Sequence, residues 1–527
     1  MKTYVSITLV LLLLVGTLQA QTLDDALRFN KRELTGTSRS LGMANAFGAL
    51  GGDLSAISIN PAGIAVYRSS EFAFTPSITL NNSKAEFGQF SSKDDKYAFP
   101  FNQIGIVTTN KPMREKSSGI ISTHFGFTYN RNADFNSNTT MMLKNGVTDI
   151  YDNEGHISQA NTLLNNILLE ANGYYGDELT GRAQLAYDAY LFDPLFEGAS
   201  EYYSQYEAII DYDDGTSGIF NRNVNGISQQ NIIEQSGYAG EYGFTFGANV
   251  SNILLIGASV NLQTFRFEQK ESFREINDNS FDPTSNFDLD YYDYYSKLNQ
   301  KGLGFGAKTG IILNLHPVRL GASFHIPTFY NIDEEYYSGV ESYFLDNEYT
   351  RYHPKSAIGE FSYTYRTPYR AQGSAAFVLG KFALISFDYE MTDHTSAKIK
   401  SKNGYDRAFE QLNEDINSRF KVTHDFKAGI EVRPVPFLAI RAGAAYFDSP
   451  IKKEFVDVEP VKWMATAGFG IRNKNFFFDL AYAQKLNEEN YYLATDEGSK
   501  LYGLSFQEPV NLTNRNHQAS FTFGWKF

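Results

Sequence analysis

The last residues of the chain, His517–Phe527, read HQASFTFGWKF and alternate between apolar and polar side chains. Ala519, Phe521, Phe523, Trp525 and Phe527 share one phase, and Gln518, Ser520, Thr522, Gly524 and Lys526 share the other. Successive side chains of a β-strand point to opposite faces, so one face of this strand suits lipid and the other suits water. An edge strand of a soluble domain shows the same alternation, and other parts of the chain decide between the two.

The amino-terminal segment indicates export. Residues 1–20, MKTYVSITLVLLLLVGTLQA, have an early lysine, an apolar run from Val5 to Val15 and a small-residue cleavage pattern, which is typical of a signal peptide. We therefore expect the mature chain to begin at Gln21. A terminal strand that is rich in aromatic residues and ends with phenylalanine resembles the signal that the barrel insertion machinery of the bacterial outer membrane recognises. That machinery is thus an expected partner during biogenesis.

Composition excludes several classes of protein. The chain has no cysteine, so it has neither a disulfide framework nor a thiolate metal site. Its net charge of −14 argues against a nucleic-acid partner. The mean hydropathy of −0.34 resembles that of a soluble protein, but a transmembrane barrel has similar values because only every second residue faces lipid. The eight histidines are scattered and form no metal or catalytic motif, so we expect no metal, no cofactor and no enzymatic activity.

Alternating segments recur along the chain, and their polar phase carries charged residues. A soluble sandwich would turn such a phase to outer water, whereas a membrane barrel turns it to the lumen. The candidate lumen-facing residues are Arg319, His325, Lys427, Glu431, Arg441 and Asp479.

The spacing of these segments favours the barrel. The predicted strands cover residues 71–80, 101–109, 119–131, 241–250, 253–268, 302–314, 318–334, 360–379, 382–395, 421–432, 437–447, 461–472, 475–485 and 514–527. Short links such as Ser251-Asn252 alternate with long ones such as 81–100, as in outer-membrane barrels. We predict an all-β fold, a transmembrane antiparallel barrel of about 14 strands over residues 71–527, with both chain ends on the periplasmic side. Phe265 and Phe267 break the phase of their strand, which predicts a β-bulge near Gln263.

The longest predicted connection, 132–240, has helical patterns. Leu163, Leu164, Ile167 and Leu168 fall on one face of a helix, and a second helical pattern covers 183–192. Two interpretations stay open: the helices pack on each other and cap the barrel, or they form an external apolar groove. Other long connections are acidic and rich in tyrosine, which indicates a solvated surface beside outer-membrane lipid and lipopolysaccharide.

The segment before the first predicted strand is rich in small residues. Residues 38–67 read SRSLGMANAFGALGGDLSAISINPAGIAVY. Asn60 is a favoured helix N-cap and Pro61 a favoured first helical residue, and the upstream glycines permit close backbone contact. Such a segment suits a narrow space, so we predict that residues 21–70 form a helical plug inside the lumen.

This segment, with its motif Asn60-Pro61-Ala62-Gly63, resembles the hatch of FadL/TodX-type outer-membrane transporters of long-chain fatty acids and other hydrophobic compounds. Residues 250–262 and 302–330 resemble hairpins of that family. The resemblance implies a passive channel whose partner is a hydrophobic small molecule. It implies capture on helical external loops, a pocket in the barrel, and release through hatch movement and a gap in the wall.

Other functions remain open from the sequence. The same barrel could be a binding or adaptor component of a surface or secretion system, which the large acidic loops favour. A haem-binding outer-membrane receptor is a further alternative, although no paired histidine ligands are evident. An outer-membrane lipid hydrolase has no motif in its favour.

Overall fold

The computed structural model describes residues 23–112, 118–147, 150–151, 157–159, 162–211, 217–221, 226–278, 289–345, 351–356, 358–402, 407–455, 462–491, 493 and 509–527. The segment predicted to be a signal peptide lies outside these residues, so its assignment stays a prediction. None of the described helices combines the length and hydropathy that a membrane-spanning helix requires.

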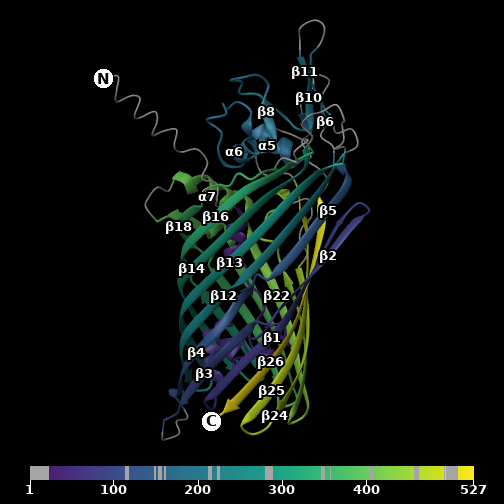
Figure 1. The fold of residues 1–527 in the computed structure, drawn as a ribbon. Coiled ribbons are helices and arrows are strands. Elements are labelled where there is room, and N and C mark those ends of the chain that lie inside the picture. Colours follow the sequence, from purple (N-terminus) through teal and green to yellow (C-terminus); the bar gives the residue numbers. More distant parts are fainter. Residues whose placement is uncertain are drawn as a thin grey trace, which may run out of the picture.

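Antiparallel strands close into a 14-stranded barrel (Figure 1). In several positions two shorter strands lie in line, and β1 closes the barrel by pairing with β26 from Glu71↔Lys526 onward. The barrel strands are β1 (Glu71–Phe87), β2 (Phe90–Ala98), β3 (Phe101–Asn110), β4 (Ile120–Asp134), β5 (Ser137–Val147), β12 (Ile227–Val250), β13 (Leu254–Asn277), β14 (Leu289–Leu315), β15 (Val318–His325), β16 (Phe329–Phe344), β18 (Gly359–Arg366), β19 (Arg370–Leu379), β20 (Ala383–Asp393), β21 (Lys398–Ser401), β22 (Val422–Val435), β23 (Leu438–Phe447), β24 (Lys462–Arg472), β25 (Phe476–Tyr491) and β26 (Val510–Lys526).

The outer face of the barrel is apolar. Outward-pointing side chains such as Phe246, Phe305 and Phe387 are 58%, 56% and 52% exposed, whereas their inward neighbours are buried. A closed sheet leaves no unpaired edge, and an apolar outer band is what lipid requires. The barrel therefore spans a membrane in the manner of outer-membrane barrels.

The short turns that the sequence predicts, such as Ser251-Asn252, lie at one end of the barrel, together with the C-terminus (Figure 1). The backbone N–H of Phe527 donates to the carbonyl of Ser70 at 3.0 Å, so the first and last strands meet there, as an even strand number predicts. The first described helix is α2 (Leu23–Asn30), and the chain end before it lies outside the described residues. Its buried Phe29 packs in one cluster with Phe409 of α7 (Arg407–Arg419), at the opposite end. An even number of strands places the start of β1 at the same end as the C-terminus. The residues before β1, however, form a segment long enough to cross the lumen.

The strands are longer than the sequence predicts. β1 and β2 meet at Gly88-Gln89, so the predicted 81–100 loop is mostly strand, and β13 and β14 likewise reduce the 269–301 connection. The predicted 132–240 insertion loses residues to β5 and β12 for the same reason. Both faces of a strand can meet water beyond the bilayer, so polar residues occupy both phases there and the alternation is lost.

Two further strand predictions are wrong. Segments 318–334 and 360–379 each split into two strands, near Pro327 and Pro368, because proline lacks the N–H that a ladder needs. The expected bulge near Gln263 is absent, since β13 keeps its register with β12 and β14 throughout. Phe265 and Phe267 instead stay on the inner phase, 4% and 1% exposed.

The hatch, defined as residues 23–67, lies inside the lumen, as the sequence predicts (Figure 1). It comprises α2, α3 (Ser38–Leu41), α4 (Leu54–Ile59) and the 3-10 helix η2 (Pro61–Val66). The Asn60 side chain accepts from the Ala62 N–H and Pro61 opens the helix, which confirms the predicted cap.

Residues 162–211 form an outer cap above the barrel (Figure 1). The cap contains α5 (Leu163–Ala171), α6 (Gly181–Asp188), β8 (Phe192–Pro194), β9 (Tyr202–Ser204) and β10 (Glu207–Asp211). Strand β11 (Ser217–Asn221) pairs with β10, and β17 (Arg351–Tyr352) pairs with β16. The other small elements are β6 (Ile150–Tyr151), β7 (Ile157–Gln159), η3 (His394–Ser396) and η4 (Lys453–Phe455).

The apolar face of α5 does not form an open groove. Leu163, Leu164, Ile167 and Leu168 are at most 7% exposed, because they pack with α6 and with inner residues of the extended strands. Helix α5 also docks on β13, where the carboxylate of Glu275 accepts from the Leu163 N–H at 2.7 Å. The predicted external groove is thus replaced by the cap interpretation.

Candidate functional site

Asn60 attaches the hatch to the barrel wall. It is 1% exposed, and its Nδ2 donates to the carbonyls of Gly48 at 2.8 Å and Ile311 at 3.2 Å. Gly48 belongs to the hatch and Ile311 to β14, so one side chain joins the two parts. The motif around Asn60 therefore does more than cap a helix.

Glycines in the wall allow the hatch backbone to approach closely. A Cβ at Gly257 would lie 2.3 Å from the carbonyl oxygen of Pro61, and one at Gly310 would lie 1.9 Å from Asn60 Oδ1. Similar clashes with hatch atoms would arise at Gly321, Gly429 and Gly443. Since a strand backbone has little freedom to retreat, these positions require glycine. The wall is thus shaped to fit this hatch.

A buried ion network lies below the hatch. Glu431 accepts from Arg39 Nε at 3.1 Å and from Arg441 Nε at 2.6 Å. Arg441 Nη1 also donates to Asp479 Oδ1 at 2.7 Å, and Arg433 pairs with Glu431. The side chains of Glu431, Arg441 and Asp479 are fully buried. Three of the predicted lumen residues therefore act together, and they hold the hatch through Arg39.

The other predicted lumen residues also point inward. His325 Nε2 bonds to the carbonyl of Ile59 at 2.9 Å, and Arg319 Nη1 donates to the carbonyl of Leu50 at 2.6 Å. Lys427 pairs with Glu390 at 3.0 Å and does so within the wall. The structure thus places all six on the inner side, and it brings Arg319, His325 and Glu431 onto the hatch.

An aromatic cluster packs around α2 in the outer half of the lumen; we call this cluster the outer chamber. Phe29 of α2 lies at its centre, with ring centroids 4.8 Å from Phe265 and 5.0 Å from Tyr365. The ring of Tyr363 is 6.3 Å away and packs in turn on Phe409 of α7. The buried members are Ala26, Phe29, Ala133, Phe135, Ala239, Phe265, Phe267, Tyr330, Ile332, Tyr363, Tyr365, Ala397, Ile399, Phe409, Ile416 and Phe420.

The polar face of α2 is fixed as well. Gln300 Nε2 donates to Asp25 at 2.9 Å and to Glu334 at 2.7 Å, and the Tyr363 hydroxyl donates to Glu334 at 2.9 Å. Sequence reasoning missed this chamber, because α2 carries no strand pattern. The one feature of the sequence that indicates this cluster is the position of Phe265 and Phe267 on the inward-facing phase of their strand.

The wall has a seam between β2 and β5, which lie next to each other (Figure 1). The β3–β4 ladder ends at Gln103↔Asn130, and no backbone ladder joins β2 to β5 among the described residues. Side chains bridge the seam instead, as where Asp94 accepts from the Thr140 N–H at 2.6 Å. Gln103 contacts Ser55 of the hatch at 3.0 Å, so the seam begins beside the hatch.

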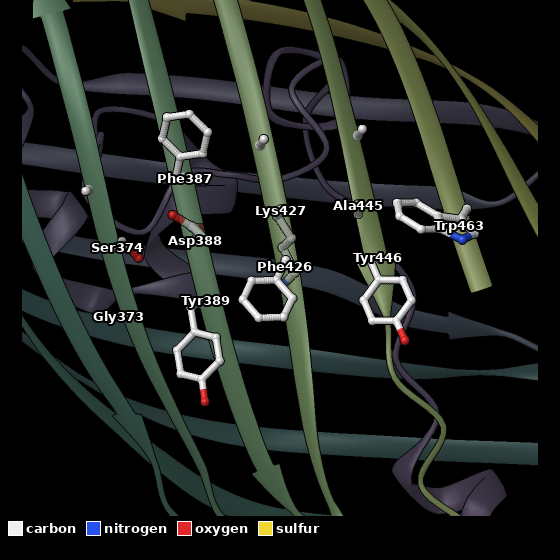
Figure 2. A pocket seen from close by; sticks show the side chains of 13 residues that line it. Gly373, Ser374, Phe387, Asp388, Tyr389, Phe426, Lys427, Ala445, Tyr446 and Trp463 are labelled. Carbon is white, nitrogen blue, oxygen red and sulfur yellow. The ribbon is translucent and has the colours of Figure 1, made fainter. Parts of the chain in front are cut away.

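A hollow of about 830 Å³ lies on the lipid-facing side of the wall, from β19 to β24. Figure 2 shows the rings of Phe387, Tyr389, Phe426, Tyr446 and Trp463 on neighbouring strands, with Asp388 and Lys427 in the same view. Phe387, Phe426 and Trp463 are each 52% exposed, whereas Asp388 and Lys427 are buried. The hollow therefore faces lipid and lies outside the lumen.

Among the described residues, no group of three or more histidine, aspartate or glutamate side chains is placed to hold a metal ion. From the outer end inward, the lumen holds the outer chamber around α2, the rest of the hatch, and a mouth at the end where the predicted short turns lie.

Comparison with solved structures identifies the fold. A FadL homologue from Pseudomonas aeruginosa superposes with a TM-score of 0.53, over 94% of this chain and 99% of its own, at 12% identity. The chain has a FadL-type fold. A deltaS2 mutant of the TodX monoaromatic hydrocarbon channel gives a TM-score of 0.50 over 92% of this chain and 98% of its own, also at 12% identity. No protein-family model matches the sequence, and no curated protein matches it.

At these identities the likeness concerns the fold. The FadL-type barrel and its internal hatch confirm the architecture that the Asn60-Pro61-Ala62-Gly63 segment predicts. The outer chamber, the seam and the hatch contacts are formed by this chain's own residues.

Proposed function

We propose that this FadL-type barrel is a passive outer-membrane channel for hydrophobic small molecules. The observation that carries the proposal is the outer chamber, an apolar and aromatic space in the lumen that the chain's own helix α2 fills. A water-filled pore gives apolar solutes no advantage, whereas an apolar chamber does. Each CH₂ group that leaves water gains about 0.8 kcal/mol.

In the proposed mechanism, a ligand replaces α2 within the chamber. Ala26 and Phe29 make the contacts that an apolar ligand would make, so ligand entry and withdrawal of α2 are coupled. The fixed polar face of α2 around Asp25 and Gln300 holds the closed state until the apolar contacts are exchanged.

Phe29→Ala should increase affinity for apolar ligands, because it leaves a ring-sized space among Phe265, Tyr363 and Tyr365. We expect an environment-sensitive fluorescent fatty acid to bind the detergent-solubilised variant about tenfold more tightly. The matched control is Phe305→Ala, which removes a lipid-facing ring and should leave affinity unchanged. Equal ligand affinities of Phe29→Ala and the wild type would show that α2 does not occupy the ligand site.

We place the side exit of uncharged ligands at the seam. Fewer backbone hydrogen bonds must break there than at a laddered pair of strands, and the seam adjoins the hatch. Outward rings beside it, including Phe99 at 80% exposure, offer an apolar path into the bilayer.

Locking the seam should slow the release of uncharged ligands. The Ser92 hydroxyl donates to the Thr140 carbonyl across the seam. Because the chain has no cysteine, Ser92→Cys/Thr140→Cys introduces a single pair of thiols there. Bridging the pair with a short bis-thiol reagent should lower hydrocarbon uptake by about tenfold, since a locked gate becomes rate-limiting. The unbridged double variant is the control, and unchanged uptake after bridging would place the exit elsewhere.

The direct test of the function is flux into vesicles. Purified mature protein in phosphatidylcholine liposomes should accelerate the entry of oleyl alcohol and of a monoaromatic hydrocarbon over empty liposomes. Rates equal to those of empty liposomes for both solutes would refute the proposal.

A second candidate function is suggested by the outer cap, which presents exposed rings of Tyr174, Tyr175 and Phe196 at 55%, 52% and 69%. Exposed aromatic residues are enriched where proteins bind partners, which is the surface the adaptor alternative needs. Deleting these rings should then abolish a partner interaction without changing flux.

A further inference from the structure

The hollow on the lipid-facing side of β19–β24, which we call the wall hollow, has a floor of small residues between large rings. Ala428 and Ala444 are opposite each other in the β22–β23 ladder, and both lie on the outward phase. The ring of Phe387 stands beside this floor, since Phe387 pairs with Ala428 on one side and with Ala375 on the other. A Cβ added at Gly373 would meet no atom within 4 Å. The wall hollow is therefore an open depression in the outer surface of the barrel.

A row of rings forms the rim of the wall hollow on the side away from the short turns (Figure 2). Its members are cross-strand partners on β20, β22, β23 and β24, namely Tyr389, Phe426, Tyr446 and Trp463. The Tyr389 hydroxyl and His424 Nδ1 are hydrogen-bonded at 2.7 Å. Tyrosine and tryptophan gather where a membrane meets water, with their polar ends among the lipid headgroups. The wall hollow thus opens into the outer leaflet, below the level of the headgroups.

The strands behind the wall hollow form a continuous wall. Along the rows that line it, the ladders from β19 to β24 keep their register. The inward neighbours are buried and bonded on the lumen side: Asp388 accepts from the Gly48 N–H at 2.9 Å, and Lys427 pairs with Glu390 at 3.0 Å. The wall hollow therefore has no path into the lumen through these strands, in contrast to the seam.

Dispersion contacts favour filling of the wall hollow. Its volume of about 830 Å³ is within the range of small-molecule sites, about 300–1,000 Å³. Lipid tails are as apolar as the hollow, so the hydrophobic effect gives no driving force there, and close packing provides it instead. Atoms that line a void lose dispersion contacts, and a chain that lies on the alanine floor between the rings restores them.

We propose that the wall hollow is a binding site for an acyl chain of an outer-leaflet lipid, which it holds at a fixed place on the barrel. The occupant is a lipid of the surrounding bilayer, because the hollow is continuous with the apolar outer band and is closed toward the lumen. The floor at Ala428 and Ala444 receives the chain, and the rings of Phe387, Phe426 and Tyr446 pack against it. This site is separate from the proposed channel path.

Retention of a lipid through detergent extraction tests the site, because loosely associated lipids are lost whereas a bound one is kept. Delipidated protein is reconstituted in dibrominated phosphatidylcholine, extracted again in mild detergent and examined by native mass spectrometry. We expect the wild type to retain a lipid and Ala428→Leu/Ala444→Leu, which fills the floor, to lose it. The matched control is Ala258→Leu/Ala307→Leu, which adds the same bulk on the outward phase of β13 and β14 and should keep the lipid.

Tryptophan fluorescence locates the lipid without a substitution in the floor. The chain has two tryptophans, Trp463 at the rim of the wall hollow and the exposed Trp525 on β26. Bromine atoms on an acyl chain quench a nearby indole. After the second extraction, Trp463 emission should stay quenched in Trp525→Phe, whereas Trp525 emission should recover in Trp463→Phe.

Three outcomes would overturn the proposal. The first is a wild type that retains no lipid and whose Trp463 emission recovers fully. The second is equal retention by the two double variants, which would place the retained lipid elsewhere on the barrel. The third is a doubled protein mass in place of a lipid adduct, which would make a second copy of this chain the occupant. None of them bears on the channel function, because no flux is measured.

Discussion

Gly257→Val should displace the hatch and turn the closed barrel into an ion-conducting pore. A Cβ at this position would lie 2.3 Å from the Pro61 carbonyl oxygen and 2.6 Å from the Ala62 nitrogen. Both are hatch backbone atoms, so no flexible side chain can move aside, and β13 is held by ladders on both sides. The strain is therefore relieved by movement of the hatch.

Planar-bilayer recording measures this effect. We expect the variant to show steady ionic conductance where the wild type shows little, and its hatch to become sensitive to protease while the barrel stays folded. Gly373→Val is the matched control, since nothing lies within 4 Å of its added Cβ and it faces outward. A Gly257→Val protein as tight to ions as the Gly373→Val protein would show that these glycines do not seat the hatch.

Glu431→Gln should have the second largest effect, through the ion network below the hatch. Glu431 is fully buried and accepts from Arg39 and Arg441, and it also pairs with Arg433. Without its charge, buried guanidinium groups lose their main counterion. Breaking a buried pair from one side typically costs about 3–5 kcal/mol.

Thermal unfolding in detergent, followed by circular dichroism and by heat-dependent gel migration, measures the loss. The expected result is a clearly lower midpoint with earlier release of the hatch. Glu86→Gln is the control, because its pair with Lys84 is exposed and such pairs contribute about 0–1 kcal/mol. Equal midpoints for the two variants would mean that the network does not stabilise the hatch.

The sequence predicts the barrel strands correctly wherever a strand has one polar and one apolar face. His517–Phe527 and the charged inner phase around Arg441 follow that rule, and the strands formed where it holds. The alternation is lost beyond the bilayer, where β13 and β14 continue through residues that the sequence pattern assigns to a loop. There both faces can be polar, so periodicity no longer reports the backbone.

The sequence predicts the candidate site only in part, because local patterns do not report contacts between distant residues. The Asn60-Pro61 segment reveals a local cap, and small residues indicate a confined space. The partners of Asn60, however, are carbonyls of Ile311 and Ala322, which no local pattern places nearby. The outer chamber joins α2, β13, β18 and α7, so it exists only once the barrel has closed.

One measurement tests the claim that the hatch gates an apolar path. The hydroxyl oxygens of Ser38 in the hatch and Ser520 in β26 lie 3.0 Å apart, so Ser38→Cys/Ser520→Cys should form a disulfide in an otherwise cysteine-free chain. In liposomes, oleyl alcohol flux through the oxidised protein should fall to that of empty vesicles and return on reduction. Equal flux through the oxidised and reduced protein would contradict the account.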